Sequence, residues 1–113
     1  MNLPHDALII QQEKQELSRI RRAAMNILAG REHSISELKA KLLKKEVSVE
    51  RLEIILEELI SDGFLNEQRF TENFIRTRIE KGQGPLKIRH ELRMRGIAND
   101  LIDEHLDESF LFW

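Results

Sequence analysis

The residues best suited to chemistry are the cationic side chains between positions 76 and 95. Seven Lys or Arg residues lie there, and the only acids among them are Glu80 and Glu91. This tract is strongly basic, although the whole chain carries a net charge of −2. A guanidinium group holds phosphate or carboxylate oxygens through two parallel hydrogen bonds. The tract therefore predicts a surface that binds an anionic partner.

A helix over residues 85–95 is expected to position most of these cations. Ile88 and Leu92 mark its buried side, and Arg89 and Arg93 stack one helical turn apart on another side. No acid lies four residues from either arginine, which favours a clamp for an anion, but a solvated helix face stays an alternative. Glu91 lies four residues from Lys87 and from Arg95, so these residues could form surface pairs.

The preceding helix contributes Arg76, Arg78 and Lys81. Arg76 lies among acids, a pattern typical of solvated ion pairs, and Arg78 falls between two apolar rows, where a structural ion pair and a ligand contact are both possible. The loop at 82–84 lacks the glycine and lysine spacing of a phosphate-binding loop. Its glycines indicate a helix stop and a turn.

Capping signals define where these helices begin. Ser34 and Glu37 have the spacing of a capping box, and Pro85 suits the first turn of a helix. Further caps are predicted at Ser48, Asn66 and Asn99. No segment alternates as a strand does, so the sequence predicts an all-α fold.

The apolar pattern repeats after 50 positions. Leu38, Leu42, Val47, Leu52 and Leu56 correspond to Ile88, Leu92, Ile97, Ile102 and Leu106. In each copy a basic second helix (35–45, 85–95) precedes an acidic third helix (49–62, 100–108). We predict tandem three-helix repeats at residues 17–65 and 66–109 after an N-terminal extension at 1–16, because one such unit buries too little surface alone.

Several function classes are disfavoured by composition. The chain has no cysteine, and its four histidines are scattered without metal-ligand spacing. Catalytic residues, a cofactor site, a metal site and a small-molecule substrate are therefore not expected. The longest apolar run, at 7–10, is too short to span a bilayer, so no membrane association and a cytoplasmic location are expected.

An autonomous helix-turn-helix-like DNA-binding regulator is the alternative class. The second and third helices of each repeat have that arrangement, but the third, where a recognition helix belongs, is acidic and would repel phosphates. Few aromatics accompany the basic tract, so stacking on single-stranded bases has little support.

Two stretches resemble a known family. The run GFLNEQRF, followed by KGQGPLKIRHELRMRGI, resembles the signature of the RecX family, regulators of the bacterial RecA recombinase, and REHSISELKAKL resembles that family's first module. The resemblance covers residues 17–106. It implies an elongated, curved row of modules that binds the RecA–single-stranded DNA filament and inhibits RecA's recombinase, ATPase and coprotease activities.

The resemblance also bears on the end of the chain and on the residues expected to contact the filament. Family members normally continue into a third module, and residues 110–113, with three aromatics, resemble its start. A scaffold or dimerisation piece using this aromatic end is a further alternative. The contact residues we expect are Arg76, Lys81, Lys87, Arg89, Arg93 and Arg95, with Lys39, Lys41 and Lys45 as their first-module counterparts.

Overall fold

The described part of the chain, residues 3–110, is entirely helical in its regular structure. A computed structural model places six helices there, with side chains described for residues 5–106. The helices are α1 (Leu3–Gly30), α2 (Ile35–Leu43), α3 (Val49–Ser61), α4 (Glu67–Glu80), α5 (Pro85–Met94) and α6 (Asn99–Phe110). The predicted all-α class is confirmed.

Side-chain hydrogen bonds explain the starts of three helices, α2, α3 and α4. The Ser34 hydroxyl accepts from the Glu37 amide, while the Glu37 carboxylate accepts from the Ser34 amide, so the predicted capping box is present. Ser48 and Asn66 cap α3 and α4 in the same side-chain manner. The predicted cap at Asn99 is wrong, because α6 already begins at that residue and the carbonyl of Ala98 accepts its first turn's bond.

Two separate hydrophobic cores divide the helices into two units. Module 1 (α1–α3) is centred on Ile20, Ala24, Leu38, Leu42, Leu52, Ile55, Leu56, Leu59 and Leu65. Module 2 (α4–α6) is centred on Phe70, Phe74, Ile75, Ile88, Leu92, Ile97, Ile102 and Leu106. The residues of the 50-position repeat are buried in both units, apart from the partly buried Val47. Each unit therefore folds around its own hydrophobic core.

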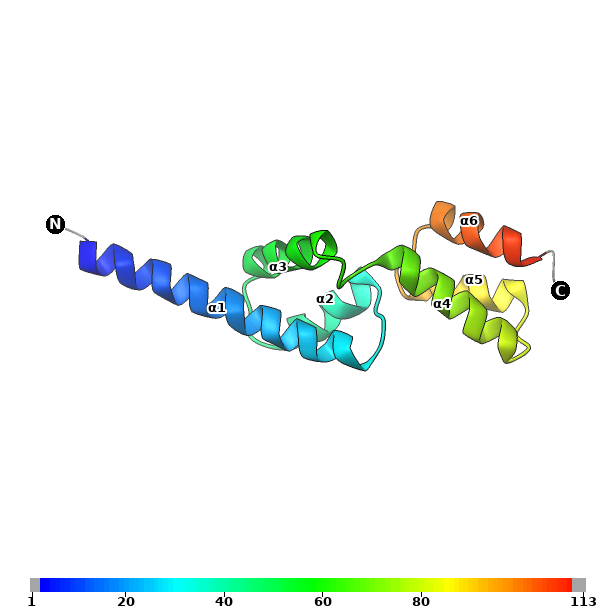
Figure 1. Cartoon of the computed structure of the whole chain (residues 1–113), viewed down its shortest axis with the longest axis horizontal. Helices are drawn as coiled ribbons and strands as arrows, with labels where there is room; N and C mark the ends of the chain where they lie inside the picture. Colours follow the sequence, from blue (N-terminus) through cyan, green and yellow to red (C-terminus); the bar gives the residue numbers. More distant parts are fainter. Residues whose placement is uncertain (1–2, 111–113) are drawn as a thin grey trace.

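The two modules follow one another along a single long axis (Figure 1). The principal extents of the molecule are 69 × 22 × 20 Å, which confirms the expected elongated tandem arrangement. The curvature implied by the family stays a prediction, as do the exact module boundaries. Of the segment 110–113, Phe110 ends α6, and residues 111–113 lie outside the described residues.

Helix α1 is longer than the apolar spacing from Leu17 predicts. It begins at Leu3, and its first half projects beyond module 1 at the blue end in Figure 1. Its Glu16 carboxylate accepts from the Ser48 amide at 3.2 Å and pairs with Arg51 at 2.6 Å, which fastens it to the start of α3. Across residues 3–110, each helix is either too short or too polar to pass through a lipid bilayer.

Candidate functional site

The contact between the modules is built from backbone turns. The loop between α1 and α2 meets the turn between α5 and α6, where the Ser34 hydroxyl donates to the carbonyl of Arg95 at 2.7 Å. Gly96 in that turn has φ +82°, and a Cβ there would lie 2.2 Å from the Ser36 hydroxyl oxygen. Only glycine combines this left-handed backbone with such a close approach.

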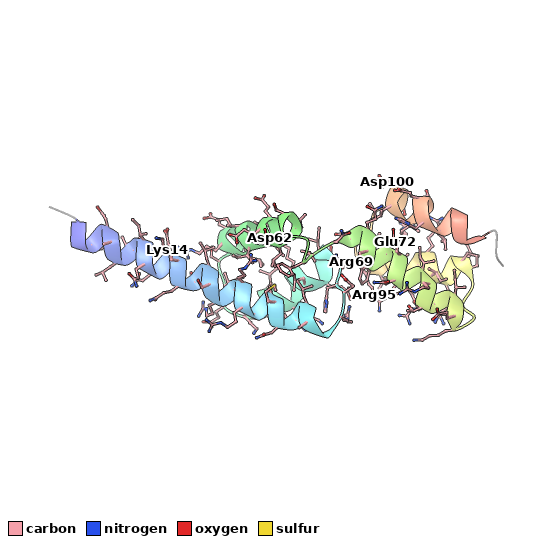
Figure 2. All side chains as sticks on the ribbon, viewed as in Figure 1. Lys14, Asp62, Arg69, Glu72, Arg95 and Asp100 are labelled. Atoms are coloured by element: carbon pink, nitrogen blue, oxygen red, sulfur yellow. The ribbon has the colours of Figure 1, made fainter. Side chains whose placement is uncertain are left out.

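The start of α4 adds a second set of contacts. Arg69 pairs with Glu32 of module 1 and donates to the carbonyl of Gly63 at 3.0 Å, so it holds the connecting turn against both modules (Figure 2). Glu67 accepts from the Ile35 amide at 3.3 Å. Burial raises the pKa of the Glu67 carboxyl, and this hydrogen bond only partly offsets the effect.

Glu37 is the central anion of the junction. Burial opposes its charged form, but hydrogen bonds from Arg31 and the Ser34 amide, with the charge of Arg95, hold the pKa of its carboxyl below the usual value. Arg31 lies 3.2 Å and Arg95 3.5 Å from one carboxylate oxygen. A carboxylate that caps a helix thus also ties two arginines from different modules together.

A groove of about 410 Å³ opens beside these contacts. The junction groove, as we call it, is lined by Arg31, Glu32, Phe70, Asn73, Phe74, Arg76, Thr77, Arg78 and Arg95. The guanidinium groups of Arg78 and Arg95 lie 4.4 Å and 4.7 Å from the centre of the Phe74 ring. Four arginines from three segments therefore meet around a buried aromatic pair.

Helices α2 and α5 hold one predicted cation each in an equivalent internal ion pair. Lys39 pairs with Glu53 of α3, and Arg89 pairs with Asp103 of α6. These two pairs correspond under the 50-residue shift. The basic second helix and acidic third helix of each repeat therefore attract one another, so the repeated charge does not by itself indicate a ligand. Arg89 therefore has an internal partner, whereas the residue spacing within its own helix predicted an unpaired clamp for an anion.

Glu91 also differs from its prediction. It does not pair with Lys87 or Arg95; its carboxylate lies 3.1 Å from Nε of Arg78, on α4. The angle between these groups is not that of a hydrogen bond, so the contact is ionic. Of the two possibilities for Arg78, the structural ion pair is present, and the same side chain also lines the junction groove.

Lys41 lies against a buried histidine. Its ammonium is 2.7 Å from Nε2 of His33, whose Nδ1 is 3.0 Å from the Arg31 carbonyl. Burial, together with the charges of Arg31 and Lys41, lowers the pKa of His33, and the backbone hydrogen bond opposes this. A neutral ring that donates from Nδ1 and accepts at Nε2 satisfies both contacts.

The remaining predicted cations are exposed. Lys45, Lys81, Lys87 and Arg93 make no ion pair with a residue in the described part of the chain, and Arg76 donates to the Asn73 amide oxygen at 2.7 Å. Lys87 and Arg93 share α5 with Leu86 and Met94, which are 83% and 75% exposed. The outer face of α5 thus combines free positive charge with exposed apolar side chains.

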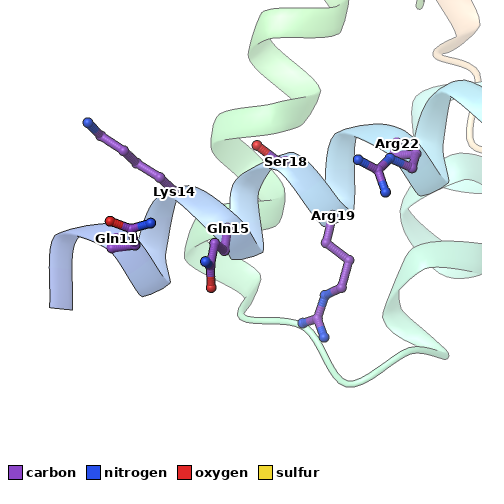
Figure 3. Close-up of a pocket in the computed structure, with 6 residues that line it drawn as sticks. All are labelled: Gln11, Lys14, Gln15, Ser18, Arg19 and Arg22. Carbon is purple, nitrogen blue, oxygen red and sulfur yellow. The ribbon is translucent and has the colours of Figure 1, made fainter. Parts of the chain in front are cut away.

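A second basic surface, on α1, was missed by sequence reasoning. Lys14, Arg19 and Arg22 lie there with Gln11, Gln15 and Ser18 around an open depression of about 380 Å³ (Figure 3). Their recurrence every three to five residues was a readable signal, but the acids Glu13 and Glu16 hid it in the segment's total charge. In the structure Arg51 forms ion pairs with both acids, so the negative charge of this segment is paired within the chain.

Among residues 5–106, no group of three or more His, Asp or Glu side chains is placed to hold a metal ion. The two depressions described above, on α1 and at the junction, are open to the surface, which suits contact with a macromolecule better than enclosure of a small ligand.

Comparison with known proteins matches both modules to one family. Residues 21–59 match the description "RecX, first three-helix domain", and residues 66–106 match "RecX, second three-helix domain". Regulatory protein RecX of Halorhodospira halophila is 44% identical over 94 residues, which are 83% of this chain and 58% of that protein. Regulatory protein RecX of Pseudomonas putida F1 is 47% identical over 94 residues, 83% of this chain and 60% of that protein.

Solved structures agree on the fold. A crystal structure of RecX from Lactobacillus salivarius superposes with a TM-score of 0.79 at 23% identity, over 82% of this chain and 61% of that one. A second RecX crystal structure gives 0.85 at 22% identity, over 92% and 52%. The chain spans about three-fifths of the length of these curated relatives. With two consecutive three-helix domains matched, it belongs to the RecX family.

Proposed function

We propose that this chain binds the RecA–single-stranded DNA filament in the cytoplasm and inhibits RecA recombinase, its ATP hydrolysis and its coprotease activity. The observation that carries the proposal is the match of both modules to RecX domains, together with relatives named regulatory protein RecX. Because the chain covers only part of those relatives, the activity of two modules is itself part of the proposal.

The distribution of charge supports a composite target. The cationic α5 packs against the acidic α6, which gives module 2 a surface with positive and negative charge carried by separate helices. Such a surface orients an approaching polyanion instead of attracting it from every side. A nucleoprotein filament offers both phosphates and protein side chains, which suits a surface with arginine forks, free lysines and exposed apolar residues.

The proposed contact residues can be ranked by whether another side chain of this chain already binds them. Those free of an internal acid come first, namely Arg76, Lys81, Lys87, Arg93 and Lys45. Those with an internal partner come second, namely Arg89, Arg95, Lys39 and Lys41. Each member of the second group is already held by a carboxylate or an imidazole of this chain, which reduces what it contributes to binding.

The test is ATP hydrolysis by RecA on single-stranded DNA with increasing amounts of this chain. The wild-type chain should lower the rate in a saturable manner. Arg93→Glu should require a several-fold higher concentration for half-maximal inhibition, because it reverses an exposed charge on α5. Lys44→Glu makes the same change in charge outside the proposed contact set and should inhibit like wild type.

A folded wild-type chain that leaves the ATPase rate unchanged at saturating concentration contradicts the proposal. Tight binding to duplex DNA without RecA, falling steeply with salt, would favour the autonomous DNA-binding regulator instead. The acidic surface of α3, which includes the exposed Glu50, Glu57 and Glu58, argues against that outcome.

A further inference from the structure

The junction groove contains guanidinium groups that are fixed in place and only partly used. Arg78 and Arg95 pack on Phe74, and each contacts a carboxylate of this chain through Nε, with Glu91 and Glu37 respectively. Their terminal nitrogens have no hydrogen-bond partner among the described residues. A guanidinium held by stacking and by Nε presents the remaining pair of donors with little loss of side-chain entropy.

A third arginine extends this set of donors. Arg76 lies two residues from Arg78 on α4 and bonds only a neutral amide, that of Asn73. Arg31 completes the wall from module 1, where it is already occupied by Glu37 and by the Glu32 carbonyl. The groove thus offers unsatisfied donors from Arg76, Arg78 and Arg95 to an oxygen-rich anion.

The surroundings of these donors favour carboxylates over a nucleic acid backbone. Phe70 and Phe74 are 3% and 9% exposed, and two guanidinium groups pack near the Phe74 ring, so neither ring offers a platform for a base. Glu32 lines the groove, and Glu37 and Glu91 contact Arg95 and Arg78. Consecutive phosphates would meet this negative charge, whereas single carboxylates fit between the cations.

The size and lining of the groove point to a short peptide. A volume of about 410 Å³ accommodates a few side chains, and the aliphatic stems of the arginines with Phe74 form apolar walls. We infer that the junction groove binds an acidic protein segment in which glutamate or aspartate neighbours an aliphatic residue. This inference rests on the proposed function, since it assigns the protein part of the filament contact to this groove.

Binding to the chain alone tests the inference without RecA. A dye-labelled peptide of glutamate, leucine and glycine should raise fluorescence anisotropy when the chain is titrated in, and its glutamine counterpart should not. Arg76→Gln should weaken binding about tenfold, through loss of one charged hydrogen-bond donor. Arg93→Gln removes the same charge from α5, away from the groove, and should bind like wild type.

Three results would overturn the inference. The first is equal binding of the glutamate and glutamine peptides, and the second is equal loss in Arg76→Gln and Arg93→Gln. The third is complete displacement of the peptide by single-stranded oligothymidylate, which would assign the groove to phosphates. Circular dichroism checks that each variant is folded. RecA ATPase inhibition by the wild-type chain, measured in parallel, separates failure of this groove from failure of the proposed function.

Discussion

The two modules bury the same pattern of apolar residues, but their arginines make different contacts. In module 1, Arg21 of α1 pairs with Glu58 of α3 at 3.0 Å and with Asp62, the residue after α3, at 2.9 Å. In module 2, Arg69 and Arg95 reach across to Glu32 and Glu37 of module 1. Arg21 therefore ties the first unit to itself, whereas Arg69 and Arg95 of the second unit tie the two units together.

Equivalent helix starts show the same contrast. Ser34, before α2, is fully buried and bonds the α5–α6 turn, while its counterpart Gly84, before α5, is exposed and makes no side-chain cap. The repeated hydrophobic positions fix how each module folds. The residues between them decide what each module contacts.

Matched core truncations should have the largest effect. Leu42→Ala and Leu92→Ala each remove a fully buried side chain at equivalent positions, so each should reduce the free energy of unfolding by ~2–5 kcal/mol through a cavity. Urea unfolding measured by circular dichroism gives both values. A loss below about 1 kcal/mol at either site would show that the two cores are not equivalent.

Two glycines with the same backbone conformation allow the contact between the modules to be tested separately from backbone strain. Gly82→Ala and Gly96→Ala both force a side chain into a left-handed conformation, at a cost of about 1 kcal/mol. Gly82 faces open space, whereas the new methyl group at Gly96 would collide with Ser36. Gly96→Ala should therefore lower the melting temperature clearly more than Gly82→Ala, and equal decreases would contradict the described junction.

Acid should weaken the molecule through His33. Because its pKa in the folded chain lies below the ordinary 6.5, the unfolded chain binds a proton more readily. The stability that this residue contributes is thus fully present above pH 6.5 and falls as the pH drops below it. Glu67, with its raised pKa, contributes the opposite trend at lower pH.

The variant His33→Gln separates these effects. It should flatten the decrease of melting temperature with falling pH, while His90→Gln, at an exposed position of module 2, should leave the wild-type profile unchanged. An identical pH profile for wild type and His33→Gln would remove His33 as the responsible group.

The repeated ion pairs should have the smallest effect. Double-mutant cycles on Lys39 with Glu53 and on Arg89 with Asp103 should each give a coupling of about 0.5 kcal/mol, because all four side chains are at least a quarter exposed. Similar values in both modules would confirm equivalence. A coupling well above about 1 kcal/mol for one pair only would make that pair a special feature of its module.

Much of the fold could be predicted because its signals are local. Ser34, Ser48 and Asn66 each satisfy an amide three residues away, so type and spacing suffice. The predicted cap at Asn99 was wrong because asparagine is also tolerated inside the first helical turn. The pairing of Lys39 with Glu53 had a readable signal, since the same separation of 14 positions recurs at Arg89 and Asp103.

The junction groove could not be predicted in the same way. Arg31 and Arg95 meet at Glu37, and Arg95 lies 58 positions beyond that carboxylate. Such contacts depend on how two separately packed modules dock, which no helical periodicity encodes. The cations of α5 were expected from sequence, but their division into paired and free side chains required the structure.

The most direct measurement is binding of the fluorescently labelled chain to RecA assembled on oligothymidylate, compared with binding to oligothymidylate alone and to RecA without DNA. The assembled filament should bind the chain most tightly, and Arg76→Glu combined with Arg93→Glu should largely abolish that binding with helical content unchanged. Two results would contradict the claim that the two modules dock on the filament. One is binding to the filament no tighter than to bare oligothymidylate, and the other is binding that the double charge reversal leaves unchanged.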